Sequence, residues 1–426
     1  MNPEPTPSRI RICVATSYQA TDEPRSPRYA AALAMLDPAI EIIFVDCVPR
    51  GRDAAVPPEL ASLANVTRKS WHFAWKGRGK PRLLIEKVRQ HLAQRSFRLG
   101  GEARTEALST RSIGLEQILL AEKADLYFGF NIDTLLPVYH AARNAGAQFM
   151  FDCQEVYAEM AHQQTDVERE MMRAIQRQCL PECALVLSAS RQAAEYMERE
   201  FGITGVLPLL NAPPKEELPE WEPTTDFTLY WRNGTIDLGP RGLEDALRAM
   251  RLLPGGIHLY LQGRPVTDGS DRVGSLIRAL GIDDRVTILP PYRSEEAVHM
   301  ASLHSVGLSL ESPDRINSDL STSNKFFDYV MGGLAIISTR TEGLRHLIEA
   351  NELGLVYEKG NPSDLARQIL LLYNNRERLA QMRRNAREYA LREGNLEFQM
   401  ARFLQEFRQR VLPLLASRAK ARAGGP

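Results

Sequence analysis

Two charged residues three positions apart, Lys325 and Asp328, follow a loop rich in Pro, Asp, Asn and Ser and open a stretch with helical spacing. An apolar run precedes the loop, and another follows Gly332-Gly333. This order predicts strand, loop, helix and strand, with the helix N-terminus at the carboxyl edge of a parallel sheet. Free N–H groups and the helix dipole favour an anion there, and Lys325 adds a positive charge. The pattern predicts a phosphate site, with Asp328 suited to accept hydrogen bonds from sugar hydroxyls.

A second interpretation of the same pair is a solvated ion pair at i,i+3 on a helix surface. The strand–loop–helix–strand setting favours the anion site instead. The N–H groups at Ser323 and Asn324, in the first turn of the predicted helix, would then face the bound anion.

The residues SNKFFDYVMGGLAIIS, 323–338, resemble the donor-site signature of bacterial GT-B glycosyltransferases of the GT4 type. The resemblance extends roughly from Ile10 to Met400 and implies a nucleotide-sugar donor. Asp328 falls where the family usually has a Glu that contacts the ribose. The family also has a Glu eight positions earlier, where this chain has Leu320.

Two carboxylates near that missing Glu are candidate substitutes, Glu311 and Asp319. Another turn at a predicted strand end, Thr341-Glu342-Gly343, can contact the sugar or a phosphate.

The segment NGTIDLGPRGLEDALRAM, 233–250, is similar to the part of the family that lies near the donor diphosphate. Gly234 lets the backbone approach a phosphate. Arg241 matches the basic residue of the pattern, and its planar donors suit two diphosphate oxygens. The Arg that commonly follows the first Gly is Thr235 here, and Arg232 is its candidate replacement.

In the first half, MFDCQEVYAEM at Met150–Met160 resembles a family segment in which a His precedes a Glu after a strand. Gln154 stands in place of that His and can bond an acceptor hydroxyl, but it cannot transfer a proton. Glu155 or Asp152 is therefore the candidate base. The alternative is that these two carboxylates cap the following helix.

These assignments form one predicted site. The predicted catalytic residues are Arg241, Lys325 and Glu155. The predicted donor-binding residues are Gly234, Arg232, Ser323, Asn324, Asp328, Thr341 and Glu342. The predicted acceptor-binding residues are Asp152, Gln154 and Arg28. The other Arg of that loop, Arg25, can meet an anionic acceptor or face water, as can Arg28.

Alternating strand and helix patterns predict an α/β fold of two doubly wound, Rossmann-like domains facing a cleft. The proline-rich, acidic stretch 213–226 separates an acceptor-binding domain at 1–212 from a nucleotide-sugar-binding domain at 227–395. The resemblance implies that the helix and tail at 396–426 cross back to the first domain, as in GT-B enzymes.

The stretch Val66–Leu99 has an unusual excess of basic residues with interleaved aromatics, offset by Glu86 alone. Its basic residues are Arg68, Lys69, Lys76, Arg78, Lys80, Arg82, Lys87, Arg89, Arg95 and Arg98. An amphipathic surface helix is one interpretation, because Leu83, Leu84, Val88 and Leu92 form one stripe. Peripheral contact with an anionic membrane or a lipid-linked acceptor is another. We expect no nucleic-acid partner.

Composition excludes several classes of protein. The 53 Lys and Arg balance 53 Asp and Glu, so global charge indicates no polyanionic partner. No GxGxxG follows the first strand, which argues against an NAD or FAD enzyme. The five cysteines have no zinc spacing or disulfide framework, which favours a reducing cytoplasm. The N-terminus has no apolar signal core, and no apolar run reaches the length of a membrane span.

The predicted function is transfer of a sugar from a nucleoside-diphosphate sugar to a glycan, lipid-linked or small-molecule acceptor. The resemblance implies a retaining enzyme without a cofactor. No Asp-x-Asp metal site of the GT-A type is evident, so no metal is expected. Two alternatives remain open, a sugar-nucleotide 2-epimerase and a non-catalytic GT-B partner protein.

Overall fold

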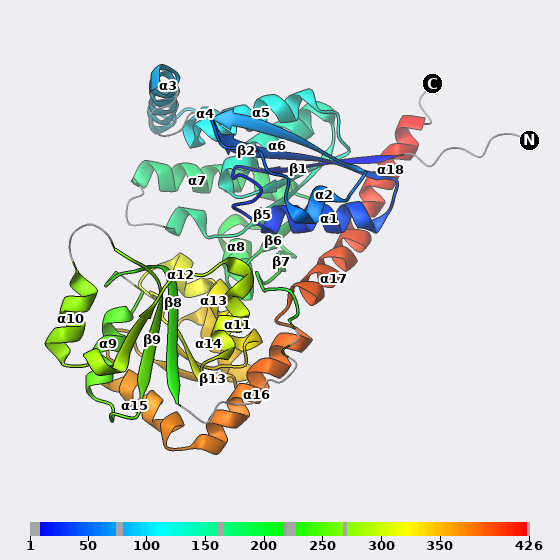
Figure 1. Ribbon diagram of the computed structural model, residues 1–426. Helices are drawn as coiled ribbons and strands as arrows, with labels where there is room; N and C mark the ends of the chain where they lie inside the picture. Colours follow the sequence, from blue (N-terminus) through cyan, green and yellow to red (C-terminus); the bar gives the residue numbers. More distant parts are fainter. Residues whose placement is uncertain are drawn as a thin grey trace, which may run out of the picture. The chain divides into compact units, whose positions relative to one another are not determined.

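The computed structural model describes residues 9–73, 80–160, 165–216, 218, 227–239, 241–266 and 271–423. Contacts within the chain define two compact units (Figure 1). The first comprises Met1–Leu209 and Met400–Pro426, and the second comprises Leu210–Gln399. Most of the expected linker 213–226 lies outside the described residues, so its role stays a prediction.

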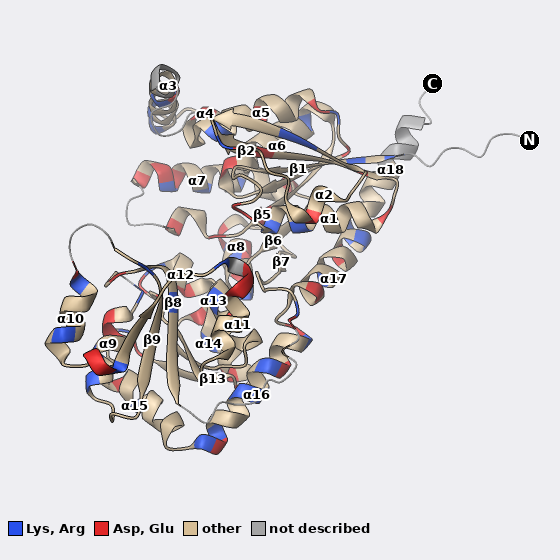
Figure 2. Ribbon diagram, in the orientation of Figure 1, with Lys and Arg blue, Asp and Glu red and all other residues tan. Residues whose placement is uncertain are grey.

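The first unit is built on a parallel sheet of seven described strands in the order β3-β2-β1-β4-β5-β6-β7. The strands are β1 (Ile10–Thr16), β2 (Ile40–Pro49), β3 (Val66–Phe73), β4 (Leu126–Phe130), β5 (Gln148–Cys153), β6 (Leu185–Ser188) and β7 (Leu207–Pro208). Its helices are α1 (Arg25–Leu36), α2 (Pro58–Ala61), α3 (Lys80–Arg98), α4 (Thr105–Leu108), α5 (Thr110–Ala121), α6 (Ile132–Ala145), α7 (Asp166–Cys179) and α8 (Arg191–Phe201). Because helices cover a parallel sheet on both faces, its strands are mostly apolar and carry few charges (Figure 2).

The second unit contains a parallel sheet of six described strands in the order β10-β9-β8-β11-β12-β13. The strands are β8 (Thr228–Ile236), β9 (His258–Pro265), β10 (Val286–Leu289), β11 (Val306–Ser309), β12 (Ala335–Thr339) and β13 (Gly354–Tyr357). Its helices are α9 (Leu243–Arg251), α10 (Arg272–Leu280), α11 (Ala297–Ser302), α12 (Ile316–Leu320), α13 (Asn324–Met331), α14 (Glu342–Ala350), α15 (Pro362–Tyr373) and α16 (Arg376–Arg392).

The strand order of each unit reverses at one point. The reversal falls between β1 and β4 in the first unit and between β8 and β11 in the second. The loops that leave two such strands turn away from each other, which opens a crevice at the carboxyl edge where ligands bind in open α/β sheets. The predicted donor residues flank the β8–β11 reversal, because Arg232 lies in β8 and α13 follows the loop after β11.

The C-terminal segment continues through α17 (Leu396–Glu406), a π-helical turn at Phe407–Val411 and α18 (Leu412–Ala423). Its residues from Met400 onward belong to the first unit. Phe403 and Phe407 are fully buried in the core of that unit, and the ring of Phe403 lies 4.7 Å from that of Tyr29 in α1. The chain therefore completes the core of the first unit with its own C-terminal residues.

The prediction of one helical pattern across Val66–Leu99 is wrong for its first part. Val66–Phe73 forms the edge strand β3, paired in parallel with β2. Alternating exposed and half-buried residues explain the strand, since period-two patterning suits an edge with one solvated face. Residues 74–79 lie outside the described residues, and helix α3 begins at Lys80.

Candidate functional site

Lys325 and Asp328 both lie on the buried side of α13. Their exposed fractions are 5% and 8%, so the interpretation as a solvated i,i+3 pair is wrong. The ammonium of Lys325 lies 2.7 Å from the carboxylate of Glu311. It also lies 3.5 Å from the carbonyl oxygen of Leu310, to which it donates a hydrogen bond. Each of the two charged residues has its own partner from another part of the second unit.

The partner of Asp328 is Arg232, whose guanidinium donates to the Asp328 carboxylate. The backbone N–H of Arg232 donates to the hydroxyl of Tyr329, 3.0 Å away, so α13 is tied to β8 at two consecutive residues. The guanidinium also lies 5.9 Å from the ring centre of Tyr292, as a cation–π contact. Arg232 therefore orients the carboxylate that the sequence assigned to the ribose.

Arg241 lies near the Lys325 side chain, because the residue after it, Gly242, packs against Leu310. Its guanidinium donates to the side-chain oxygen of Asn233, 3.1 Å away. The next residue, Gly242, has a φ of 67°, and a Cβ there would lie 3.0 Å from the Cβ of Leu310. Leu310 is the residue whose carbonyl bonds the ammonium of Lys325. The loop that carries Arg241 thus packs directly on the strand end that holds Lys325.

The electrostatics agree with this proximity. Burial lowers the pKa of Lys325, and the opposite charge of Glu311 raises it. The positive charges of Arg241 and Arg232 lower the same pKa further, because like charges destabilise each other when they are close. The five side chains Arg232, Arg241, Lys325, Glu311 and Asp328 sum to one positive charge. This edge of the second unit is therefore suited to an anion.

The first turn of α13 provides backbone N–H donors for that anion, and the end of β8 provides open space beside Gly234. Ser323 is the N-cap residue, and its side chain forms no cap hydrogen bond. The side-chain oxygen of Asn324 accepts a hydrogen bond from Asn211, 3.0 Å away, so that side chain faces its neighbour. A Cβ built on Gly234 would meet no described atom within 4 Å, so the space beside this residue is open.

The two substitutes for the missing acidic residue have other roles. Glu311 is held by Lys325. Asp319 accepts a hydrogen bond from the backbone N–H of Glu342, 3.0 Å away, at the start of α14. The carboxylate of Glu342 itself pairs with Arg345 at 2.8 Å. Neither Asp319 nor Glu342 therefore presents a carboxylate without a protein partner.

Thr341 is the N-cap residue of α14 and is almost fully buried. Its hydroxyl has no hydrogen-bond partner among the described residues. A buried polar atom without a partner is uncommon in a folded protein. Among the predicted donor residues, Thr341 thus retains an unused hydroxyl.

In the first unit, Asp152 is fully buried in an ion pair rather than open to an acceptor. Its two oxygens accept hydrogen bonds from Arg25, at 2.6 Å from Nε and 3.1 Å from Nη2. The pair explains why neither residue faces water, and it argues against Asp152 as a base or an acceptor contact. Arg28 is also engaged, with its Nε 3.7 Å from the carboxylate of Glu59.

Gln154 and Glu155 follow β5 directly and do not cap the next helix. Helix α7 is capped by Thr165, whose hydroxyl accepts from the backbone N–H of Glu168 while the Glu168 side chain accepts from the Thr165 N–H. The helical turn that comes before α7, Tyr157–Glu159, has Val156 as its N-cap residue, so the interpretation of Asp152 and Glu155 as helix caps is wrong. The side-chain nitrogen of Gln154 is buried without a described hydrogen-bond partner. Glu155 stays the candidate base.

Two residues of this edge were missed by the sequence patterns. Asn131 follows β4 with a φ of 65° and accepts a hydrogen bond from the hydroxyl of Ser17, 2.8 Å away. Glu23 accepts hydrogen bonds from the backbone N–H groups of Arg25 and Ser26, and burial raises its pKa to about 7. A polar residue directly after an apolar strand was the signal for Asn131.

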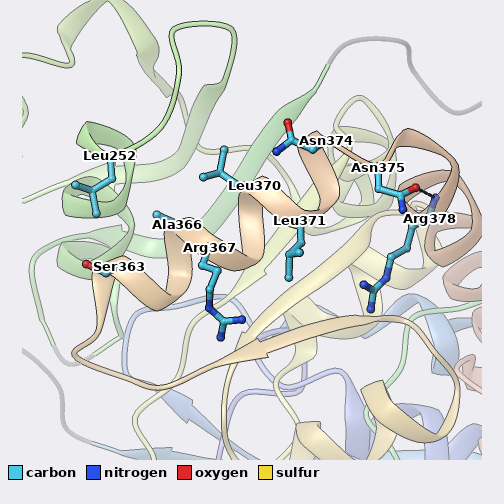
Figure 3. Close-up of a pocket in the computed structure, with 9 residues that line it drawn as sticks. All are labelled: Leu252, Ser363, Ala366, Arg367, Leu370, Leu371, Asn374, Asn375 and Arg378. Carbon is cyan, nitrogen blue, oxygen red and sulfur yellow. Dashed lines mark hydrogen bonds between the residues drawn. The ribbon is translucent and has the colours of Figure 1, made fainter.

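Two cavities on the described surface of the second unit differ in character, and the unit is not limited to these. One, of about 260 Å³, lies at the carboxyl ends of β8 and β9 and is lined by Ile236–Gly239, Pro265 and the start of α10. The other, of about 500 Å³, follows the length of α15 (Figure 3). Its Asn375 caps α16 and its Arg367 pairs with Asp364. The α15 cavity includes none of the predicted site residues, whereas the smaller cavity adjoins the loop after β8.

Among the described residues, no group of three or more His, Cys, Asp or Glu is placed to hold a metal ion. None of the described helices has the length and apolar character needed to cross a membrane.

Several solved structures resemble this chain over nearly its whole length. Sucrose-phosphate synthase from Thermosynechococcus elongatus is 15% identical with a TM-score of 0.67, covering 94% of this chain and 99% of that one. Anabaena HepE in complex with UDP-glucose is 11% identical with a TM-score of 0.64, covering 94% and 100%. TarM of S. aureus, in complex with fondaparinux, alpha-GlcNAc-glycerol and UDP, is 10% identical with a TM-score of 0.63, covering 93% and 99%.

No curated protein matches the sequence. Residues 328–389, which begin at Asp328, match the family model described as glycosyl transferases group 1. The two parallel-sheet units and the whole-chain likeness show the GT-B fold. The chain is thus a GT-B protein that carries a group 1 glycosyltransferase segment, which supports a glycosyltransferase enzyme.

Proposed function

We propose that this protein transfers a sugar from a nucleoside diphosphate, with UDP as the nucleotide, to a hydroxyl of a glycan, lipid-linked or small-molecule acceptor. The observation that carries the proposal is the grouping of Arg241, Arg232 and Lys325 at the N-terminus of α13, with one positive charge in excess. The UDP and UDP-glucose complexes of the structural relatives support the choice of nucleotide.

The proposed chemistry forms a bond between the acceptor oxygen and the anomeric carbon and breaks the bond from that carbon to the diphosphate. The electron pair of the broken bond stays on the leaving diphosphate. Arg241, Lys325 and the first-turn N–H groups of α13 would stabilise that charge. The carboxylate of Asp328, held by Arg232, would accept hydrogen bonds from the ribose hydroxyls. The hydroxyl of Thr341, which has no described partner, would donate a hydrogen bond to a sugar or phosphate oxygen.

The acceptor side of the proposal rests on the carboxyl edge of the first unit. Glu155 would accept the proton of the acceptor hydroxyl. Gln154, whose side-chain nitrogen is buried without a described partner, would donate to an acceptor oxygen. In line with the GT4 resemblance we propose retention at the transferred carbon, which requires that the acceptor oxygen form its bond on the same face from which the diphosphate leaves. We also propose no metal or cofactor requirement and, from the cysteine pattern, a cytoplasmic protein.

Calorimetry with UDP, GDP, ADP and TDP tests the site and the base together. We expect UDP to bind most tightly, with affinity unchanged by EDTA. R241Q should weaken UDP at least tenfold, since one charged hydrogen bond is worth about 1.5–3 kcal/mol. R248Q is the matched control, because Arg248 is an exposed arginine of α9 paired with Glu244. Absence of affinity for all four nucleotides would overturn the proposal.

One observation favours a non-catalytic GT-B partner as the second candidate. Both carboxylates near the missing acidic position, Glu311 and Asp319, are held by other groups of the protein. Incubation with UDP-sugars and candidate acceptors separates the two, because an enzyme releases UDP and a partner protein binds without turnover. The 2-epimerase alternative would convert a UDP-sugar to its epimer without any acceptor.

A further inference from the structure

Helix α3 packs on the first unit through a face that combines two glutamines with Ala93 and Phe97. The side chain of Gln90 donates to the carbonyl of Leu108, 2.8 Å away, and that of Gln94 donates to the carbonyl of Ala107, 3.1 Å away. Ala93 lies on the same side, partly buried against the core of the unit. Figure 1 shows α3 beside α4, which supplies those carbonyls.

The opposite face of α3 is mostly apolar and exposed. Leu84, Val88 and Leu92 are 66%, 51% and 57% exposed, and Ile85 and Leu99 are exposed as well. At about 100° per residue the four that belong to α3, Leu84, Ile85, Val88 and Leu92, fall within an arc of roughly 100°, and the exposed Arg95 projects within the same arc. An ordinary surface helix turns such a stripe toward the core. Here Gln90, Gln94 and Phe97 face the protein, whereas the leucines of the stripe face solvent.

Basic residues border this apolar arc on both sides. Lys87 and Arg98 lie on one side of it and Arg89 on the other, all exposed. The sequence of α3 holds six Lys and Arg against one acidic residue, Glu86, whose side chain is partly buried. The whole chain is electrically balanced. The positive charge is therefore a local property of this helix.

We infer that the exposed face of α3 binds the surface of an anionic lipid bilayer. The leucine arc would enter the boundary between headgroups and acyl chains, and the bordering Lys and Arg would contact lipid phosphates. A uniformly negative surface matches both basic borders at once. A second copy of the chain would instead oppose like charges across the contact. The inference is independent of sugar transfer, because it involves none of the donor residues.

Co-sedimentation of the full chain with vesicles tests the inference. Vesicles of phosphatidylcholine mixed with anionic phosphatidylglycerol are compared with vesicles of phosphatidylcholine alone. We expect at least tenfold stronger binding to the anionic vesicles, weakened by added salt because the borders are charged. Equal binding to both vesicles, or none, would overturn the inference.

Two variants separate the contributions of the arc and its borders. L84S/V88S/L92S removes apolar area, and K87Q/R89Q/R98Q removes charge; each should lower anionic-vesicle binding at least tenfold. L252S/L303S, at exposed leucines of the second unit, is the matched control and should bind as the natural chain does. Circular dichroism checks that each variant is folded. A dimer in light scattering that L84S/V88S/L92S converts to monomer, without vesicle binding, would assign the face to a second copy and refute the inference.

Discussion

The ammonium of Lys325 lies 2.7 Å from the carboxylate of Glu311, and both groups are buried at the carboxyl edge of the second unit. The ion pair has two consequences. It allows a lysine to remain charged inside the protein, and it holds that charge at the first turn of α13. The same contact occupies the carboxylate that could otherwise have replaced the missing acidic residue of the donor site.

Removing one partner of this pair should destabilise the protein more than removing both. K325M or E311Q alone leaves one buried charge unpaired, which costs about 3–5 kcal/mol. The double variant should recover much of that loss, because no unpaired charge remains. Its UDP affinity should stay at least tenfold below that of the natural chain. Urea unfolding measures the first effect and calorimetry the second. Double-variant stability equal to the sum of the single losses would contradict a coupled pair.

Asp328 should distinguish UDP from its 2′-deoxy analogue. If its carboxylate accepts a hydrogen bond from the ribose, the natural chain binds UDP about tenfold more tightly, since such a bond to a charged group is worth about 1.5–3 kcal/mol. D328N should reduce that ratio toward one. R232Q should reduce it partly, because the carboxylate loses its orienting partner. A ratio unchanged in D328N would show that Asp328 serves only as the partner of Arg232.

Glu23 should make the stability of the first unit depend on pH. Burial raises its pKa from 4.5 to about 7. Between these values the folded chain holds a proton that the unfolded chain has released, so the stabilisation is present below pH 4.5 and is lost as pH rises through 7. The gain in stability of E23Q over the natural chain should therefore grow from about 1 kcal/mol at pH 5 to about 3 kcal/mol at pH 8. E295Q, at an exposed glutamate of the second unit, should show no such gain in urea unfolding.

The amide variant of Asp152 should lose stability, whereas the amide variant of Glu155 should lose catalytic activity. D152N replaces the carboxylate that pairs with buried Arg25 by a neutral amide, so it should lower the free energy of unfolding by about 3 kcal/mol. The molecules that remain folded should still transfer sugar from the donor. E155Q should lower turnover by about 10²–10⁴ with UDP affinity unchanged, as expected for loss of a general base. The measurements are unfolding curves and initial rates at a temperature where both variants are folded. Full turnover in E155Q would remove Glu155 from the mechanism.

Much of the fold could be predicted because its signals are local. The predicted order of strand, loop, helix and strand around Lys325 is found as β11, α13 and β12, with the short helix α12 inside the loop. A run of apolar residues between turn residues predicts a buried strand, and this prediction does not require knowing which strands lie beside it. The edge strand β3 was not predicted because Arg68 and Lys69 give it the basic composition of a surface helix, although Arg68 in fact pairs with the buried Asp46.

The sequence by itself determined that a helix with Lys325 and Asp328 begins at a strand end, and that α3 has an apolar stripe. Only the tertiary structure decided the partners, since Arg232 and Asp328 are 96 residues apart and Arg25 and Asp152 are 127 apart. Strand order brings such distant residues together, and no local pattern encodes it. Periodicity likewise defines a stripe on a helix but not which side of that helix meets the protein, because that choice depends on the surface against which the helix packs.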